Sequence, residues 1–521
     1  MKKLTITVFI ALVSFFNNVN AQLSKELISK EEQLYRPNYH FTPQANWMND
    51  PNGLYYLDGV YHLFFQYYPD GNKWGPMHWG HATSEDLVKW NEQEIALFPD
   101  ELGYIFSGSA VVDKNNTSGF GDGKNVPVIA FYTYHDPIKE KENKVDIESQ
   151  ALAYSLDNGK TWTKYKNNPI IKNSGVRDFR DPKVIRDEVH QQWIMSLAVH
   201  DKTEFYSSKN LKDWELLSEF GKDLGAHDGV WECPDFFPIK IDGSNETKWV
   251  LIQNLNPGGP HGGSGVQYFV GDFDGKSFKT DALFTKQLAK EKAVWLDWGM
   301  DNYASVSFDN VPNDKRVIIG WMSNWLYAQE VPTERWRSSN TIAREVTLVK
   351  SADGYILKNI PVAQLAKYQG EKISKNIKIK SSQTIFKKDE IDLTKAVIDL
   401  DFKKMTRGVY TFTLSNSLGE KLTFGVDNKE KSLFIDRRKS GKINFGEKFA
   451  EKVTKAPLSK SLTKGEFKIL LDKTSIEIFY NDGEKVMTEI FFPNESYNQL
   501  SLHTDTKGSS VKVNAYQLNL N

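Results

Sequence analysis

One short turn pattern recurs three times in the first half of this 521-residue chain. Each copy begins with Ser, carries Asp or Asn two residues later and reaches a Trp six or seven residues after the Ser. Short β-type runs flank the copies, so each copy predicts a β-hairpin. A hairpin unit that recurs every several tens of residues is typical of a β-propeller, whose sheets pack around a central channel. The copies are Ser84–Trp90, Ser155–Trp162 and Ser208–Trp214.

The sequence around these repeats is also β-type. From Tyr35 to about Val349 the runs are short, alternating or aromatic-rich, with hardly any sustained helical period. Val60–Tyr67 is one expected strand, and Pro69–Asn72 after it predicts a turn. Aromatic residues make up 13% of the chain, which favours β-rich folds and also suits sugar-binding surfaces. These patterns predict an all-β fold and leave the number of propeller blades open.

A second β region follows a change of composition. Residues 361–375 contain a Pro, a Gly and several lysines, which predicts a linker. Farther on, Ile476–Ile490 alternates on both sides of Asn481-Asp482-Gly483, the pattern of a tight β-hairpin. We therefore expect a two-sheet β-sandwich over residues 376–521. Two further runs predicted to pair as strands are Val409–Leu414 and Lys421–Val426.

Residues 1–21 have the form of a secretion signal. Two lysines precede the apolar run Leu4–Phe16, and the small residues of Val19–Ala21 mark a cleavage point. We therefore expect an exported protein, periplasmic or extracellular, whose mature chain begins at Gln22. The sequence contains no other apolar stretch long enough to span a bilayer.

Charge and cysteine content limit the classes of partner. A net charge of −1 argues against nucleic acid or an anionic membrane, which need a basic excess, and it suits a neutral polyol. Cys233 is the sole cysteine, which excludes an intramolecular disulfide. Because no metal-type spacing of Cys and His is present, we expect no metal and no cofactor. The sequence also gives no sign of an obligate protein partner. The histidines interpreted as structural rather than metal-binding are His62, His78, His81 and His135.

Three acidic residues lie in unusual local settings. Asn46–Gly53 has the composition of a tight turn, in which Asp50 would ordinarily serve as a cap. Arg180-Asp181-Pro182 and Trp231–Asp235 each place a carboxylate beside a bulky or cationic neighbour and a Pro. Any one such acid is most often structural. Three together favour a glycosidase, which needs paired carboxylates.

These segments resemble the signature blocks of glycoside hydrolase family 32, the invertase, inulinase and levanase family. The family motifs W-M-N-D-P-N-G, R-D-P and E-C occur here in order, and the similarity covers nearly the whole mature chain. It implies a five-bladed β-propeller within residues 22–360, with the active site at one end of its channel, followed by the β-sandwich. Other similar segments are Phe106–Ser109, Trp298–Asp301, Gly320–Trp325 and Pro332–Arg337.

The resemblance and the local sequence assign the same roles to the three acids. Asp50 lies among Asn residues and backbone donors that favour the anion, so we expect it to be the nucleophile. Glu232 stands between Trp231 and Cys233-Pro234, where an apolar wall would raise the pKa of the carboxyl and make it the acid/base. Asp181, which its neighbour Arg180 should keep anionic, would stabilise the transition state.

Neighbouring polar and aromatic residues are expected to bind the sugar. Amides and hydroxyls would bond to its hydroxyl groups, and flat side chains would pack on the furanose ring. The structural alternatives are blade core for the aromatic residues and an ion pair with Asp181 for Arg180. The positions are Asn49, Gln66, Trp74, Phe106, Ser107, Arg180 and Trp336.

The sequence thus predicts a secreted retaining β-fructofuranosidase that removes terminal fructosyl units from levan or inulin, and from sucrose. Asn256–Gly263 and Trp321–Gln329 are similar to loops of exo-acting enzymes and favour exo action. An endo-acting enzyme or a fructosyltransferase of the same family is the alternative. A sialidase is more distant: Ser155–Trp162 has the form of its Asp-box, but a sialidase needs an arginine cluster and a Tyr nucleophile. A non-catalytic sugar-binding propeller would have no need of all three acids.

Overall fold

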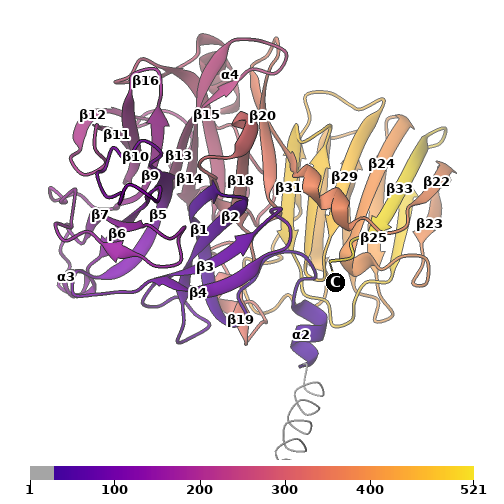
Figure 1. Ribbon diagram of the computed structural model, residues 1–521. Coiled ribbons are helices and arrows are strands. Elements are labelled where there is room, and N and C mark those ends of the chain that lie inside the picture. Colours follow the sequence, from indigo (N-terminus) through magenta and orange to yellow (C-terminus); the bar gives the residue numbers. More distant parts are fainter. Residues whose placement is uncertain (1–28, 521) are drawn as a thin grey trace, which may run out of the picture.

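The computed structural model describes residues 29–520, so the expected signal at residues 1–21 lies outside it. The fold is all-β, as predicted, with two lobes side by side (Figure 1). The N-terminal lobe is built from residues 46–361 and the C-terminal lobe from residues 373–517. None of the helices in the described part of the chain is long and apolar enough to cross a membrane. The α-helices are α2 (Lys30–Tyr35), α3 (Pro137–Lys141) and α4 (Ala282–Glu291).

Five sheets form the N-terminal lobe, and four consecutive strands of the chain form each of the first four, while β19, the fifth strand of the first sheet, comes from within the fifth sheet. Neighbouring strands pair antiparallel, except that β19 pairs in parallel with the start of β1 and so joins the end of the lobe to its beginning. The sheets are β1 (Asn46–Leu57), β2 (Val60–Tyr68), β3 (His78–Ser84), β4 (Asn91–Leu97) and β19 (Trp336–Arg337); β5 (Tyr104–Val112), β6 (Val128–His135), β7 (Glu148–Ser155) and β8 (Thr163–Lys164); β9 (Phe179–Asp187), β10 (Gln192–Val199), β11 (Lys202–Ser208) and β12 (Glu215–Phe220); β13 (Val230–Lys240), β14 (Thr247–Asn256), β15 (Gly265–Phe273) and β16 (Phe278–Thr280); and β17 (Tyr303–Ser307), β18 (Arg316–Trp321), β20 (Arg344–Lys350) and β21 (Tyr355–Pro361).

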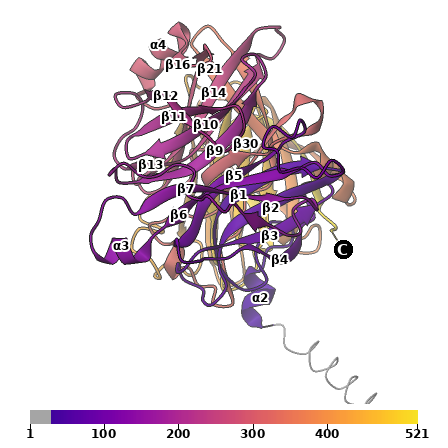
Figure 2. The ribbon, with the colours of Figure 1, turned by 60° about the vertical axis from the view of Figure 1, so that its left-hand side comes forward.

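The first strands of the five sheets meet one another. β1 contacts β5, β5 contacts β9, β9 contacts β13, β13 contacts β17, and β17 returns to β1. In Figure 2 the sheets follow one another in chain order, from the indigo strands β2–β4 to the magenta strands β14 and β16. Segments far apart in sequence therefore lie together along these five strands.

The three repeated turns occupy equivalent places, as the repeat predicts. Each connects the third and fourth strands of its sheet: β3 to β4, β7 to β8 and β11 to β12. In every copy the hydroxyl of the leading Ser accepts a backbone N–H, and the Asp or Asn oxygen accepts another. The three copies share this spacing because the Ser and Asp or Asn side chains accept backbone N–H groups that have no backbone acceptor in the turn.

One local prediction was wrong. Asn46–Gly53, expected to be a turn, lies inside the long strand β1, where the register with β2 shifts twice. Pro51 stands at the end of the first shift, where the ladder between β1 and β2 is interrupted and a strand tolerates a missing N–H. The helix α4 was also missed by the sequence reading; Asp281 caps its first turn.

The C-terminal lobe consists of two six-stranded antiparallel sheets. The predicted hairpin is confirmed as β30 and β31, and the predicted pair as β25 and β26. The sheets are β22 (Ile373–Lys378), β33 (Ser510–Gln517), β24 (Ala396–Lys404), β29 (Gly465–Leu471), β30 (Ser475–Tyr480) and β31 (Lys485–Ile490); and β23 (Ser382–Phe386), β32 (Gln499–Thr504), β25 (Val409–Ser415), β26 (Lys421–Asp427), β27 (Ser432–Lys439) and β28 (Thr454–Pro457).

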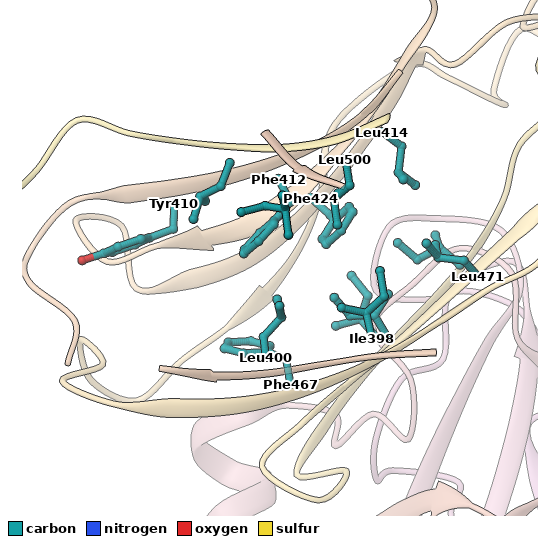
Figure 3. Close-up of a cluster of buried hydrophobic side chains, with 14 of the residues drawn as sticks. Ile398, Leu400, Tyr410, Phe412, Leu414, Phe424, Phe467, Leu471 and Leu500 are labelled. Atoms are coloured by element: carbon teal, nitrogen blue, oxygen red, sulfur yellow. The ribbon is translucent and has the colours of Figure 1, made fainter. Parts of the chain in front are cut away.

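The core of this lobe lies between its two sheets. Figure 3 shows Phe412 and Phe424 on one side facing Leu400 and Phe467 on the other. The alternating burial of β25 and β26 explains this arrangement, because every second side chain points inward. The lobes are joined by η3 (Ala363–Tyr368), which lies within the predicted linker.

Buried ion pairs tie the two lobes together. Arg344, on β20 of the N-terminal lobe, is 1% exposed and donates to Glu477 of β30 and to Asp297. In the opposite direction, Arg437 of β27 donates to Asp301 at 2.6 Å. Since buried charges are stable only when paired, each lobe supplies counter-charges that the other requires.

Candidate active site

The first strand of each of the five sheets is irregular. Each shows a register shift against the second strand of its sheet, where one or two residues are left out of the ladder. Such β-bulges redirect side chains and are common beside active sites. Asp50, Asp181 and the residues after Glu232 fall in three of these shifts, and Ser107 falls in a fourth.

Asp50 is held by one hydroxyl and one thiol. Ser107 Oγ donates to Asp50 Oδ2 at 2.7 Å, and Cys233 Sγ lies 3.6 Å from the same oxygen. Oδ1 is buried and accepts no hydrogen bond from any residue in the described part of the chain. Burial raises the pKa of Asp50, and the Ser107 hydrogen bond works against that rise. Ser107 thus fixes Oδ2, whereas Oδ1 lies buried without a hydrogen-bond partner among the described residues.

Glu232 is flanked by polar groups. Arg180 Nη2 donates to Oε1 at 2.8 Å, and the Tyr303 hydroxyl donates to Oε2. The expected apolar wall was wrong: the Trp231 indole is fully buried in the adjacent core, where it stacks on His227. Successive residues of a strand point to opposite faces, so an aromatic neighbour in sequence need not flank the carboxylate.

Asp181 adopts a left-handed backbone conformation, with φ of 65°. Its carboxylate accepts the Cys233 backbone N–H at 2.9 Å, and its own N–H donates to Thr133. Burial, together with the nearby Glu232 and Asp50, raises the pKa of Asp181 to about 7, although Arg180 acts to lower it. Burial thus opposes the expected effect of Arg180, whose Nε lies 4.0 Å from Asp181 Oδ2.

Arg180 is the central cation of the site. It donates to Asp178 at 2.7 Å and to Glu148 at 3.2 Å, in addition to Glu232. Burial acts to lower its pKa, but the surrounding carboxylates raise it well above its usual value. The sequence reading missed Glu148, Asp178 and Tyr303. Asp178 could have been found from its place two residues before Arg180 in a charged run, whereas nothing local marks Glu148.

The predicted sugar-binding residues lie in different environments. Trp74 is 37% exposed and meets Phe106 edge-on, while Phe106 stacks on His135. Asn49 is buried and accepts the Trp47 indole N–H. These contacts place Trp74 and Phe106 at an open surface near β5, which also carries Ser107.

Two other predicted positions are buried. Gln66 donates to the Ile105 carbonyl, at the bulge of β5. Trp336 is 2% exposed, in a core cluster with Met322, and Arg36 packs over its ring at 4.0 Å. Sugar contact by Trp336 stays a prediction, since the contacts of its ring with the core cluster and with Arg36 are those of a core side chain.

Two of the histidines interpreted as structural pack against each other. His62 and His81 lie 3.0 Å apart between their ring nitrogens, in a stack with Tyr55 and Phe64. Burial lowers the pKa of His62 to about 4 and that of His81 to about 3. Within residues 29–520 no three His, Cys, Asp or Glu side chains are grouped as metal ligands.

Comparison with known proteins places these features in one family. Residues 40–361 match the "Glycosyl hydrolases family 32 N-terminal domain", and residues 363–518 match "Glycosyl hydrolases family 32 C terminal". A levanase of Bacillus subtilis (strain 168) is 45% identical over 92% of this chain and 69% of its own length. An extracellular exo-inulinase of Aspergillus niger is 39% identical, over 94% of this chain and 95% of its own.

Solved structures agree. Exo-inulinase from Aspergillus awamori is 37% identical and superposes with a TM-score of 0.85, over 94% of this chain and 99% of that chain. Fructofuranosidase from Schwanniomyces occidentalis, complexed with fructose, is 35% identical with a TM-score of 0.85, over 95% and 100%. The resemblance seen in the acid motifs is thereby confirmed, and the chain belongs to glycoside hydrolase family 32.

Proposed function

We propose that this glycoside hydrolase removes terminal fructosyl units from fructans, and from sucrose, with retention of configuration. The observation that carries the proposal is the meeting of Asp50, Asp181 and Glu232 from three first strands around Cys233 and Arg180. Levanase, exo-inulinase and invertase relatives support the same substrate class. Export to the periplasm or medium is part of the proposal, supported by the signal pattern and by extracellular relatives.

The proposed architecture is a five-bladed β-propeller, residues 22–360, a linker, 361–375, and a β-sandwich, 376–521. The closed cycle of contacts among β1, β5, β9, β13 and β17 supports five blades around one channel. The core between the two six-stranded sheets supports the sandwich. The active site then lies at the channel end where the five bulges occur.

In the first proposed step the Asp50 carboxylate attacks the anomeric carbon of the fructosyl unit. Glu232 gives its proton to the departing glycosidic oxygen, and a covalent fructosyl-enzyme forms. In the second step Glu232 takes a proton from water, which attacks the same carbon and releases Asp50. Ser107 donates to Asp50 Oδ2 and so holds the carboxylate in position. Arg180 and Tyr303 hold the acid/base in the same way.

Exo action is supported by how the pocket-mouth loops are fixed. Ser264 follows the segment Asn256–Gly263. Its hydroxyl accepts the Trp325 backbone N–H, and its own backbone N–H donates to the Asn324 side chain. The ring centroids of Trp325 and Trp47 lie 5.8 Å apart. The Trp47 indole N–H donates to Asn49, which precedes the proposed nucleophile in sequence. Two loops thus close on one another next to Asp50, which suits a pocket for a chain end.

Product analysis tests the proposal. We expect the purified protein to release monomeric fructose as the sole early product from levan, inulin or both, and to act on sucrose. Because two carboxylates suffice for the reaction, EDTA should leave the rate unchanged. Chromatography of timed digests gives both results. A ladder of oligosaccharides would indicate endo action, longer products would indicate fructosyl transfer, and rescue of a chelated enzyme by a divalent ion would contradict metal-independent catalysis.

Asp181→Asn separates a transition-state contact from a structural one. If Asp181 bonds to substrate hydroxyls as charge develops, kcat should fall about 10²–10³-fold while KM changes little. The same variant should be more stable at pH 8. The raised pKa of Asp181 means that the folded protein binds a proton more tightly than the unfolded chain, so stability is lost as pH rises from about 4 to 7.

Thermal unfolding at pH 4 and pH 8 alongside steady-state kinetics checks both parts. We expect the melting temperature of Asp181→Asn to exceed that of the wild type by about 1–3 °C at pH 8, with a smaller difference at pH 4. Asp187→Asn is a matched control, because Asp187 is a buried acid of the same strand that bonds to His190 rather than to the site. A large loss of stability with kcat intact would make Asp181 a structural residue.

A further inference from the structure

A large open cavity lies at the other end of the channel from the catalytic acids. Its volume is about 1140 Å³. Tyr56 of β1 and Pro238 of β13 line it, each six residues after a catalytic acid of the same strand, Asp50 or Glu232. Six residues of strand span roughly 20 Å. The other first strands also reach the cavity, through Val112, Arg186 and Asp309, the last just after β17.

Side chains separate the cavity from the active site. Lys183 of β9 crosses the channel below Asp181, where its Nζ donates to the Ser307 carbonyl at 2.5 Å and lies 3.3 Å from Asp235 Oδ1. Lys183 and Asp235 are both buried. Because this bridge joins three first strands, the cavity is a separate compartment rather than an extension of the catalytic pocket.

The wall of the cavity carries one buried polar atom that lacks a protein partner. The Arg316 guanidinium packs over Phe237 at 4.7 Å, and its buried Nε donates to no residue in the described part of the chain. Beside it the half-buried Asp309 accepts the Val112 N–H through Oδ2. Buried polar groups of folded proteins are nearly always hydrogen-bonded, so the unpartnered Arg316 marks this part of the wall as a place for a polar ligand or solvent.

The charge pattern determines which ligand fits. The lining contains five basic and five acidic side chains, so it offers no net charge to attract an ion. An anion at Arg316 would meet the Asp309 carboxylate, and a cation at Asp309 would meet the guanidinium. A neutral diol satisfies both, since one hydroxyl accepts from Arg316 while its neighbour donates to Asp309. Amides and hydroxyls of the rim, including Asn115 and Thr247, extend the same chemistry.

We propose that this cavity is a second binding site, for a neutral oligosaccharide, with Arg316 and Asp309 as its polar anchors. The cavity volume slightly exceeds the roughly 300–1,000 Å³ of ordinary small-molecule sites, which suits several sugar units. That the oligosaccharide is a fructan rests on the proposed function. A polymer held there would raise the concentration of its chain ends around the enzyme.

Binding to an enzyme that cannot turn over tests the proposal. Asp50→Ala protein is titrated by calorimetry with 1-kestose, a neutral trisaccharide. We expect two equivalents to bind, and only one when Arg316→Ala is added. Asp309→Asn, which removes the charge but keeps the shape, should weaken the second equivalent at least tenfold. Arg438→Ala is the matched control, because Arg438 is an exposed arginine of the C-terminal lobe that pairs with Asp436.

The outcomes separate this site from the active site. A single equivalent in Asp50→Ala protein overturns the second site, whether or not the Arg316 variant folds. Unchanged binding of two equivalents by Arg316→Ala would also overturn the assignment of its anchors. Arg316→Ala with Asp50 intact should hydrolyse sucrose within about twofold of the wild-type rate, since Arg316 lines the cavity beyond the Lys183–Asp235 bridge. If the wild type cleaves no fructan while an Arg316-dependent equivalent still binds, the proposed function fails and this site stands.

Discussion

The Asp50→Ala enzyme is expected to release no measurable fructose from levan, inulin, sucrose or a fructoside with an activated leaving group. Without the carboxylate no fructosyl-enzyme can form, whatever the leaving group, and removal of a catalytic nucleophile costs on the order of 10⁵-fold or more in kcat. The structure adds a reason why no neighbour can substitute. Cys233 is the nearest alternative nucleophile, but burial and the adjacent Asp181 raise the pKa of its thiol well above the usual value.

Azide makes this experiment specific. It fits the space left by the carboxylate and attacks the anomeric carbon from the same face, while Glu232 protonates the leaving oxygen. The product would be a fructosyl azide of inverted configuration, which nuclear magnetic resonance identifies. Ser107→Ala is the matched control, because it removes the hydrogen bond to Asp50 Oδ2 and keeps the nucleophile. Full activity of Asp50→Ala, or azide rescue with retention, would exclude Asp50 as the nucleophile.

Glu232→Ala should fail differently. Natural donors have poor leaving groups that need a proton, so we expect kcat on levan, inulin and sucrose to fall about 10³–10⁴-fold. With a phenolate-type leaving group the first step needs no acid and should recover. The second step still lacks its base, so the covalent fructosyl-enzyme should accumulate, and intact-protein mass spectrometry would detect one added fructosyl unit on Asp50.

The comparison with Tyr303→Phe isolates the role of the acid itself. Tyr303 donates to Glu232 Oε2, so its loss should alter the pH profile of kcat/KM without abolishing turnover. Glu232→Gln keeps the shape of the side chain and should show the same dependence on leaving group as Glu232→Ala. Equal losses with good and poor leaving groups would remove Glu232 from the acid/base role.

Local patterns predicted what depends on local chemistry. The repeated Ser and Asp of the three turns, and the Asn481-Asp482-Gly483 hairpin, are specified by side chains and backbone preferences within a few residues. The acid motifs could be recognised for the same reason, since each is a short run of unusual composition. That the three acids lie near one another was implied by the family resemblance and by strand repetition.

Features set by packing between sheets were not accessible. The bulge at Asp50 depends on the contacts that β2 and β5 make with β1. Because these contacts are not visible in the local sequence, the composition of Asn46–Gly53 predicted a turn. Contacts with residues distant in sequence also determine where the Trp231 indole points. They likewise determine that the Arg180 guanidinium donates to Glu232 rather than to Asp181. The alternation of polar and apolar residues along a strand does not show with which cation a carboxylate will form an ion pair.

The crossed ion pairs of the interface bear on how such a chain can evolve. Arg344 finds its carboxylate partner Glu477 in the other lobe, and Arg437 finds Asp301 in the reverse direction. Removing one partner of a buried pair costs about 3–5 kcal/mol, a sizeable fraction of the stability of a typical protein. A recombination that exchanged one lobe for that of a distant relative would leave buried charges unpaired in both lobes. The two lobes are therefore constrained to be inherited together, although Asp50, Asp181 and Glu232 all lie in the N-terminal lobe.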